Sequence, residues 1–65
     1  MDKAYLRYKM DAEKIDRETV IADLGWSRQT YYDKISGRSE WKEDEIRKIR
    51  KLLGLSMSEI ETIFF

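Results

Sequence analysis

Cysteine and histidine are both missing from the 65 residues of this chain. Their absence excludes disulfide bonds, a thiolate nucleophile, zinc sites built from Cys or His, and the most common general base. The thirteen acidic residues form no pocket-like cluster along the sequence, and no glycine-rich phosphate loop is present. We therefore expect no enzyme activity, no cofactor, no metal site and no small-molecule substrate.

Proline and long apolar runs are missing as well. With no low-complexity linker and no internal repeat, the sequence predicts a single domain over residues 1–65. No apolar stretch approaches the length that spans a bilayer, and the first residues, MDKAYLRYK, lack the apolar core of a signal peptide. We expect a cytoplasmic protein with no membrane partner.

Neither sign of charge is in excess, because thirteen basic residues balance thirteen acidic ones. The distribution is less even than the total. Residues 26–38 carry Arg28, Lys34 and Arg38 against Asp33 alone, whereas the two charged residues of 55–65, Glu59 and Glu61, are both acidic. This polarity suits a DNA-binding face and a separate partner face, although a neutral total weakens nonspecific attraction to phosphates.

The apolar spacing predicts five helices and no strands, at about residues 3–13, 17–24, 27–36, 43–53 and 57–64. The second and third are the most informative. Asp16 and Ser27 are good N-cap residues, and Gly25 supplies the positive φ that ends the second helix. The segment DRETVIADLGWSRQTYYDKISG is therefore read as two short helices joined by a tight turn.

The apolar spacing also predicts which side chains of the other helices face the core. Leu6 and Met10 are expected to face the core, and Tyr5 and Tyr8 to be partly buried. The fourth helix buries Ile46, Ile49, Leu52 and Leu53 and allows the ion pairs Glu43–Arg47 and Asp44–Lys48. Ser56 and Glu59 form a capping box for the last helix, and Trp26 and Trp41 are expected to pack into the core.

Three stretches, LGWSRQTYYDKISG, GRSEWKEDEIRKI and LGLSMSEIETIFF, together resemble the small Cro and repressor type (XRE-like) helix-turn-helix proteins of temperate phages. The resemblance implies an all-α, compact five-helix helix-turn-helix domain of the lambda-repressor-like type. It also implies a sequence-specific transcriptional regulator in a bacterial host cell, whose partner is a double-stranded DNA operator read in the major groove by the helix starting at Ser27.

The same resemblance assigns roles to single residues. The base-reading positions are Ser27, Arg28, Gln29, Tyr32 and Asp33, and the phosphate-contacting positions are Arg17, Lys34 and Arg38. Arginine can bond guanine through two hydrogen bonds and glutamine can do so with adenine, which suits Arg28 and Gln29 to reading. Phosphate contacts would set the register of the protein on the duplex.

The C-terminal apolar residues leave a choice open. Ile60, Ile63, Phe64 and Phe65 either tuck against the first helix or contact a second subunit, since regulators of this kind bind near-palindromic sites as homodimers.

The neutral net charge, the acidic start of the fourth helix and the apolar C-terminus favour an alternative, and three positions depart from the family pattern. Ile21 replaces a small residue, Lys14 stands where a glycine commonly ends the first helix, and the acidic Glu40, Glu43, Asp44 and Glu45 lie near the expected phosphates. The alternative is a protein-binding module on the same scaffold, such as an antirepressor, an antitoxin-like partner or an inhibitor of a host complex.

Overall fold

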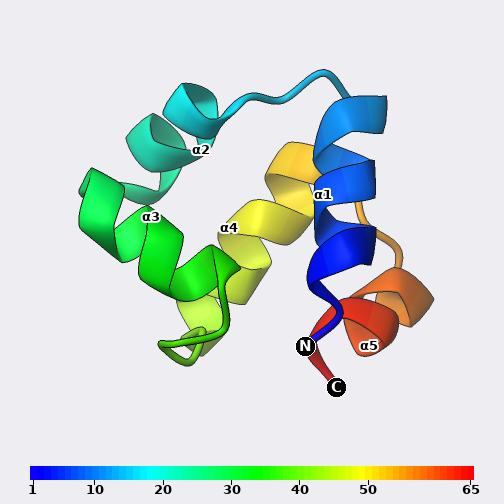
Figure 1. Ribbon diagram of the computed structural model, residues 1–65. Coiled ribbons are helices and arrows are strands. Elements are labelled where there is room, and N and C mark those ends of the chain that lie inside the picture. The colour runs from blue at the N-terminus through cyan, green and yellow to red at the C-terminus, as the bar shows by residue number, and fades with distance from the viewer.

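Five helices and no strands make up the computed structural model, which describes all 65 residues. The helices are α1 (Lys3–Ala12), α2 (Arg17–Leu24), α3 (Arg28–Ile35), α4 (Glu43–Leu53) and α5 (Met57–Phe64). These bounds confirm the predicted all-α fold class. Helices α1 and α5 lie together at one side, α2 and α3 at the other, and α4 crosses behind them (Figure 1).

Side-chain caps start four of the five helices. Asp2, Asp16, Ser27 and Ser56 each accept a hydrogen bond from the backbone N–H three residues later. These caps satisfy donors that a helix leaves unpaired in its first turn. The predicted capping box between Ser56 and Glu59 is present, with the Glu59 carboxylate accepting from the Ser56 N–H at 2.9 Å.

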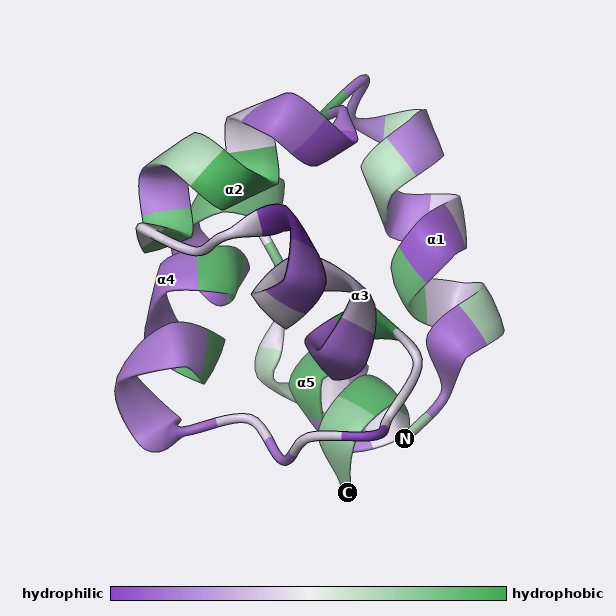
Figure 2. Ribbon diagram, turned by 60° about the vertical axis from the view of Figure 1, so that its left-hand side comes forward, coloured by the Kyte–Doolittle hydropathy of each residue, from purple (hydrophilic) through white to green (hydrophobic).

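The core receives apolar side chains from every helix, and the helices turn their hydrophobic faces toward one another (Figure 2). Leu6 and Met10 are buried as predicted, and Trp26 and Trp41 pack against the core with ring centroids 5.1 Å apart. The prediction for Tyr8 is wrong, since its side chain is 61% exposed. Tyr8 lies two residues from both Leu6 and Met10, which places it on the opposite face of α1. The buried apolar residues are Leu6, Met10, Val20, Leu24, Tyr31, Ile35, Ile49, Leu53, Leu55, Ile60 and Ile63.

Helix α5 closes the core instead of offering it to a second subunit. Ile60 and Ile63 are 5% and 0% exposed, so of the two possibilities left open by the sequence these residues pack within the chain and are not available as dimer contacts. Both side chains belong to the buried core of the single chain, where α5 packs against α1. Phe64 packs edge-on against Trp41 at 5.0 Å, and only Phe65 stays exposed.

The turn after α1 is strained. Lys14 has φ +57° and is the one residue other than glycine with a positive φ. This conformation costs an L residue with a side chain roughly 1–2 kcal/mol. Lys14, which stands where the family pattern commonly has a glycine, therefore adopts a backbone conformation that favours glycine.

Lys14→Gly is expected to stabilise the fold by about 0.5–1 kcal/mol. Removing the Cβ relieves the left-handed strain, and the larger conformational entropy of glycine in the unfolded chain offsets part of that gain. Thermal unfolding followed by circular dichroism should show a midpoint a few degrees higher. Lys14→Ala keeps the Cβ and should leave the midpoint near that of the wild type, whereas an equal rise in both variants would contradict the strain.

A polar clamp joins α1 to α5. The Glu59 carboxylate accepts from the Tyr5 hydroxyl at 2.9 Å and lies 3.1 Å from the Lys9 ammonium. Hydrogen bonds from the Ser56 N–H, Lys9 and Tyr5 lower the pKa of Glu59 from 4.5 to about 2. The same contact raises the pKa of Lys9 and of Tyr5, through their bonds to this carboxylate.

We expect this clamp to make the fold acid-sensitive. A carboxylate with a lowered pKa stabilises the folded state fully above its unfolded pKa of 4.5, and that stability is lost as the pH falls toward about 2. Glu59→Gln should therefore flatten the loss of stability between these pH values in urea unfolding experiments. The exposed Glu61, whose side chain has no hydrogen bond, provides the control, because Glu61→Gln should keep the wild-type acid response.

Candidate nucleic-acid interface

The turn between α2 and α3 fixes the angle at which α3 is presented. Gly25 ends α2 in the left-handed region at φ +68°, and the N–H of Trp26 donates to the Ile21 carbonyl at 3.0 Å. A Cβ at Gly25 would meet no atom within 4 Å, so the requirement for glycine is conformational. Ser27 then caps α3, and the two helices form a helix-turn-helix unit.

One side of α3 is held inside the protein. Tyr31 and Ile35 are buried in the core, and the Lys34 ammonium donates to the Glu40 carbonyl at 2.6 Å and to the Glu45 carboxylate at 2.8 Å. The Lys34 side chain is only 8% exposed. The expectation that Lys34 contacts phosphate is therefore wrong, because its ammonium is turned inward toward α4.

The same carboxylate ties the turn and α3 to the start of α4. The Trp26 indole N–H donates to Glu45 at 3.0 Å, and the Trp41 indole N–H donates to the Lys34 carbonyl at 3.1 Å. Burial raises the pKa of Glu45, but hydrogen bonds from Lys34, the Lys42 N–H and Trp26 outweigh burial and lower it. Glu45 is thus an internal anion. The other acidic residues of this segment, Glu40, Glu43 and Asp44, are exposed to solvent.

The other side of α3 is exposed and polar. The structure brings Arg28, Gln29, Tyr32 and Asp33 together on this face, as the sequence predicted. The Gln29 amide donates to the Asp33 carboxylate at 3.0 Å, and Arg38 lies 3.6 Å from the same carboxylate. Ser27 contributes its hydroxyl to the cap, where it accepts from the Thr30 N–H at 3.1 Å.

Arg17 and Glu18 connect the start of α2 to this face. The Arg17 guanidinium donates to the Tyr32 hydroxyl at 2.5 Å, and that bond raises the pKa of Arg17. Glu18 lies 3.3 Å from Arg28 and 3.4 Å from the Arg17 Nε. The sequence reasoning missed Glu18, since nothing in the local pattern shows that its carboxylate lies between the two arginines.

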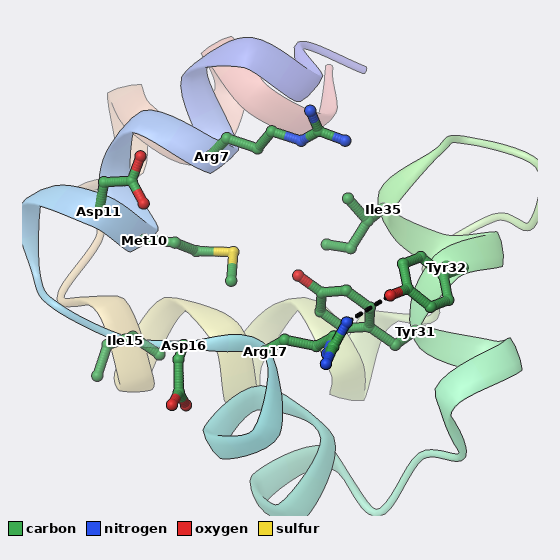
Figure 3. A pocket seen from close by; sticks show the side chains of 9 residues that line it. All are labelled: Arg7, Met10, Asp11, Ile15, Asp16, Arg17, Tyr31, Tyr32 and Ile35. Atoms are coloured by element: carbon green, nitrogen blue, oxygen red, sulfur yellow. Dashed lines mark hydrogen bonds between the residues drawn. The ribbon is translucent and has the colours of Figure 1, made fainter.

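A hollow borders the exposed face on the side of α1. It has a volume of about 430 Å³ and shares Arg17 and Tyr32 with the face just described. Figure 3 shows side chains of α1, of the loop before α2, of the first residue of α2 and of α3 around it. The candidate interface and the hollow are thus neighbours that share Arg17 and Tyr32, and these two side chains are hydrogen-bonded to each other.

Comparison with known proteins adds no assignment: the sequence matches no protein-family model, and neither curated proteins nor solved structures give a significant match. No helix combines the length and the apolar character needed to cross a membrane.

Proposed function

We propose that this chain is a sequence-specific DNA-binding transcriptional regulator of the Cro and repressor type, which reads the major groove with α3. The observation that carries the proposal is the two-sided character of α3. Tyr31, Lys34 and Ile35 fix one side to the protein, while the opposite side presents Arg28 and Gln29 to solvent. An eight-residue helix is about 12 Å long, and its diameter suits a major groove about 12 Å wide.

The exposed residues divide by chemistry. Arg28 and Gln29 can read guanine and adenine edges, and Tyr32 can contact a thymine methyl group or a phosphate. Arg17 and Arg38 flank the helix and can bond phosphates, which sets the register without reading sequence. To reach a base, Arg28 must leave Glu18, and an exposed ion pair of this kind contributes only about 0–1 kcal/mol.

Two further properties belong to the same proposal. Regulators of this type bind sites with two half-sites about 34 Å apart, which requires a second copy of the chain. Phe65 is 89% exposed and is the member of the predicted contact set that remains free for such a homodimer. The resemblance to phage proteins places the regulator in the cytoplasm of a bacterial host.

A selection from random duplexes with the purified chain tests the function. Enriched sequences should share a short motif, and binding should weaken as salt rises, with a slope of log affinity against log salt of about −0.9 for each phosphate neutralised. With Arg17 and Arg38 as contacts we expect about −1.8 for each copy. A selection that enriches nothing at low salt would contradict the proposal.

One observation favours the protein-binding module as a second candidate. Each arginine of the α3 face already has an acidic neighbour, Glu18 for Arg17 and Arg28, and Asp33 for Arg38. A surface of paired charges suits a protein partner as well as a polyanion. Binding to a protein through apolar contacts would show little salt dependence, which separates the two candidates.

A further inference from the structure

The hollow beside α3 combines an apolar floor with a cationic rim. Met10, Ile15, Ile35 and the Tyr31 ring supply apolar surface, and Arg7 and Arg17 contribute guanidinium groups. Its volume of about 430 Å³ lies in the range of small-molecule sites. This arrangement is typical of sites that bury the apolar part of a ligand and orient its polar end.

Two of the donors in the hollow are unused. The exposed Arg7 guanidinium makes no hydrogen bond or ion pair, and the Tyr31 hydroxyl makes no hydrogen bond although its ring is 8% exposed. The Arg17 Nε makes no hydrogen bond but lies 3.4 Å from the Glu18 carboxylate, so it is already paired. In Figure 3 the Tyr31 hydroxyl and the Arg7 side chain both reach into the hollow. An acceptor placed between them would satisfy these groups.

The acidic residues of the hollow do not occupy that position. The Asp16 carboxylate caps α2, accepting from the Thr19 N–H at 2.9 Å, and points away from the centre of the hollow (Figure 3). Asp11 lies at the other end of the hollow from Tyr32. Burial raises the pKa of Tyr31, so its hydroxyl remains protonated and donates at neutral pH. The space between Arg7 and Tyr31 therefore favours a negatively charged ligand.

We propose that this hollow binds a small organic anion, with a phosphate or carboxylate group held by Arg7, Arg17 and the Tyr31 hydroxyl and an apolar body resting on Met10 and Ile35. Charge-assisted hydrogen bonds from arginine are stronger than neutral ones, and two arginines on one anion add their contributions. The apolar body distinguishes this ligand from a phosphodiester of a DNA backbone, which offers the same oxygens without it.

The site is coupled to the α3 face through Arg17. This step rests on the proposed function, whereas binding of the anion does not. An anion that engages Arg17 competes with Tyr32 for the same guanidinium. Since both residues belong to the DNA-binding face, the bound anion would change the affinity for DNA, and the chain would respond to a small molecule.

Phenyl phosphate is the probe, titrated into the isotope-labelled full chain without DNA and followed by NMR. We expect saturable shifts confined to the lining of the hollow, including the Met10 methyl group. Arg7→Gln should weaken the affinity about tenfold, since it removes charge-assisted hydrogen bonds, and Tyr31→Phe should weaken it by a smaller factor. Arg7 has no partner in the fold, so the thermal midpoint of Arg7→Gln should stay unchanged.

Three controls make the outcome decisive. Arg47→Gln removes another exposed arginine, on α4, and should bind the probe like the wild type. Benzyl alcohol lacks the negative charge and should not bind. Dimethyl phosphate imitates a DNA backbone phosphate and should bind more weakly than phenyl phosphate. Equal binding of the two phosphates, or an unchanged affinity in Arg7→Gln, would overturn the proposal, and either result is obtained whether or not the chain binds DNA.

Discussion

Replacing Arg28 with alanine is expected to weaken binding to the preferred duplex by about ten- to a hundredfold, with at most a small change in the thermal unfolding midpoint. A bidentate contact between arginine and guanine discriminates against the wrong base by roughly 1–3 kcal/mol, which corresponds to that range. The Arg28 side chain is 69% exposed and its one ion pair is with Glu18, so the fold loses no more than about 1 kcal/mol with it. Fluorescence anisotropy with the selected duplex and with a scrambled duplex measures both affinities.

The pattern of loss matters as much as its size. Binding to the scrambled duplex should fall much less, because that binding depends on phosphate contacts from Arg17 and Arg38. Arg47→Ala removes an arginine of similar exposure from α4 and should leave the preference intact. If Arg28→Ala and Arg47→Ala reduce both affinities equally, Arg28 acts only through its charge and α3 is not the reading helix.

Lys34→Met is expected to destabilise the fold by about 3 kcal/mol. The substitution leaves the Glu45 carboxylate, 13% exposed, without its cationic partner, and an unpaired buried charge typically costs 3–5 kcal/mol. We expect the lower end because Trp26 and the Lys42 N–H still donate to Glu45. A chain of this length has a stability of about 3–10 kcal/mol, so much of it would be lost. Urea unfolding monitored by tryptophan fluorescence measures the change.

The double variant Lys34→Met with Glu45→Gln should recover most of this loss, since no buried charge remains. Arg47→Met breaks the exposed Glu43–Arg47 pair and should cost no more than about 0.5 kcal/mol. The lowered pKa of Glu45 adds a pH dependence: its contribution is present above the ordinary pKa of 4.5 and is lost as the pH falls through the lowered value. An additive cost in the double variant would contradict a paired network.

Much of the fold follows from short-range patterns. Asp16, Ser27 and Ser56 mark helix starts because a side-chain cap involves only the next three residues. Gly25 and Gly54 mark helix ends because their positive φ is a local requirement. The exposed set of α3 follows from helical periodicity, which also places Leu6 and Met10 inside. The Glu43–Arg47 pair follows from the i,i+4 spacing.

Tyr8 was misplaced although the periodicity of α1 puts it on the outer face, whereas the other residues that sequence reasoning misplaced depend on contacts between distant helices. Periodicity puts Lys34 on the inner side of α3, but its role as a buried cation depends on Glu45, eleven residues later. Ile60 and Ile63 are apolar on either reading, and only the packing of α5 against the rest of the core decides between core and subunit contact. The proposed roles of Glu18 and Arg7 depend on their nearness to side chains of α3, which no local sequence pattern specifies.

The attachment of α3 on its inner side has a thermodynamic consequence. Lys34 of α3 donates to Glu45 of α4, and Trp41 donates to the Lys34 carbonyl, while Trp26 in the turn before α3 also donates to Glu45. These bonds fix α3 before any partner arrives. Binding then requires no folding of a disordered segment. The conformational entropy lost by the protein on binding therefore comes from exposed side chains such as Arg28 and Gln29. Calorimetry should accordingly record a heat-capacity change close to that expected for the docking of two rigid surfaces.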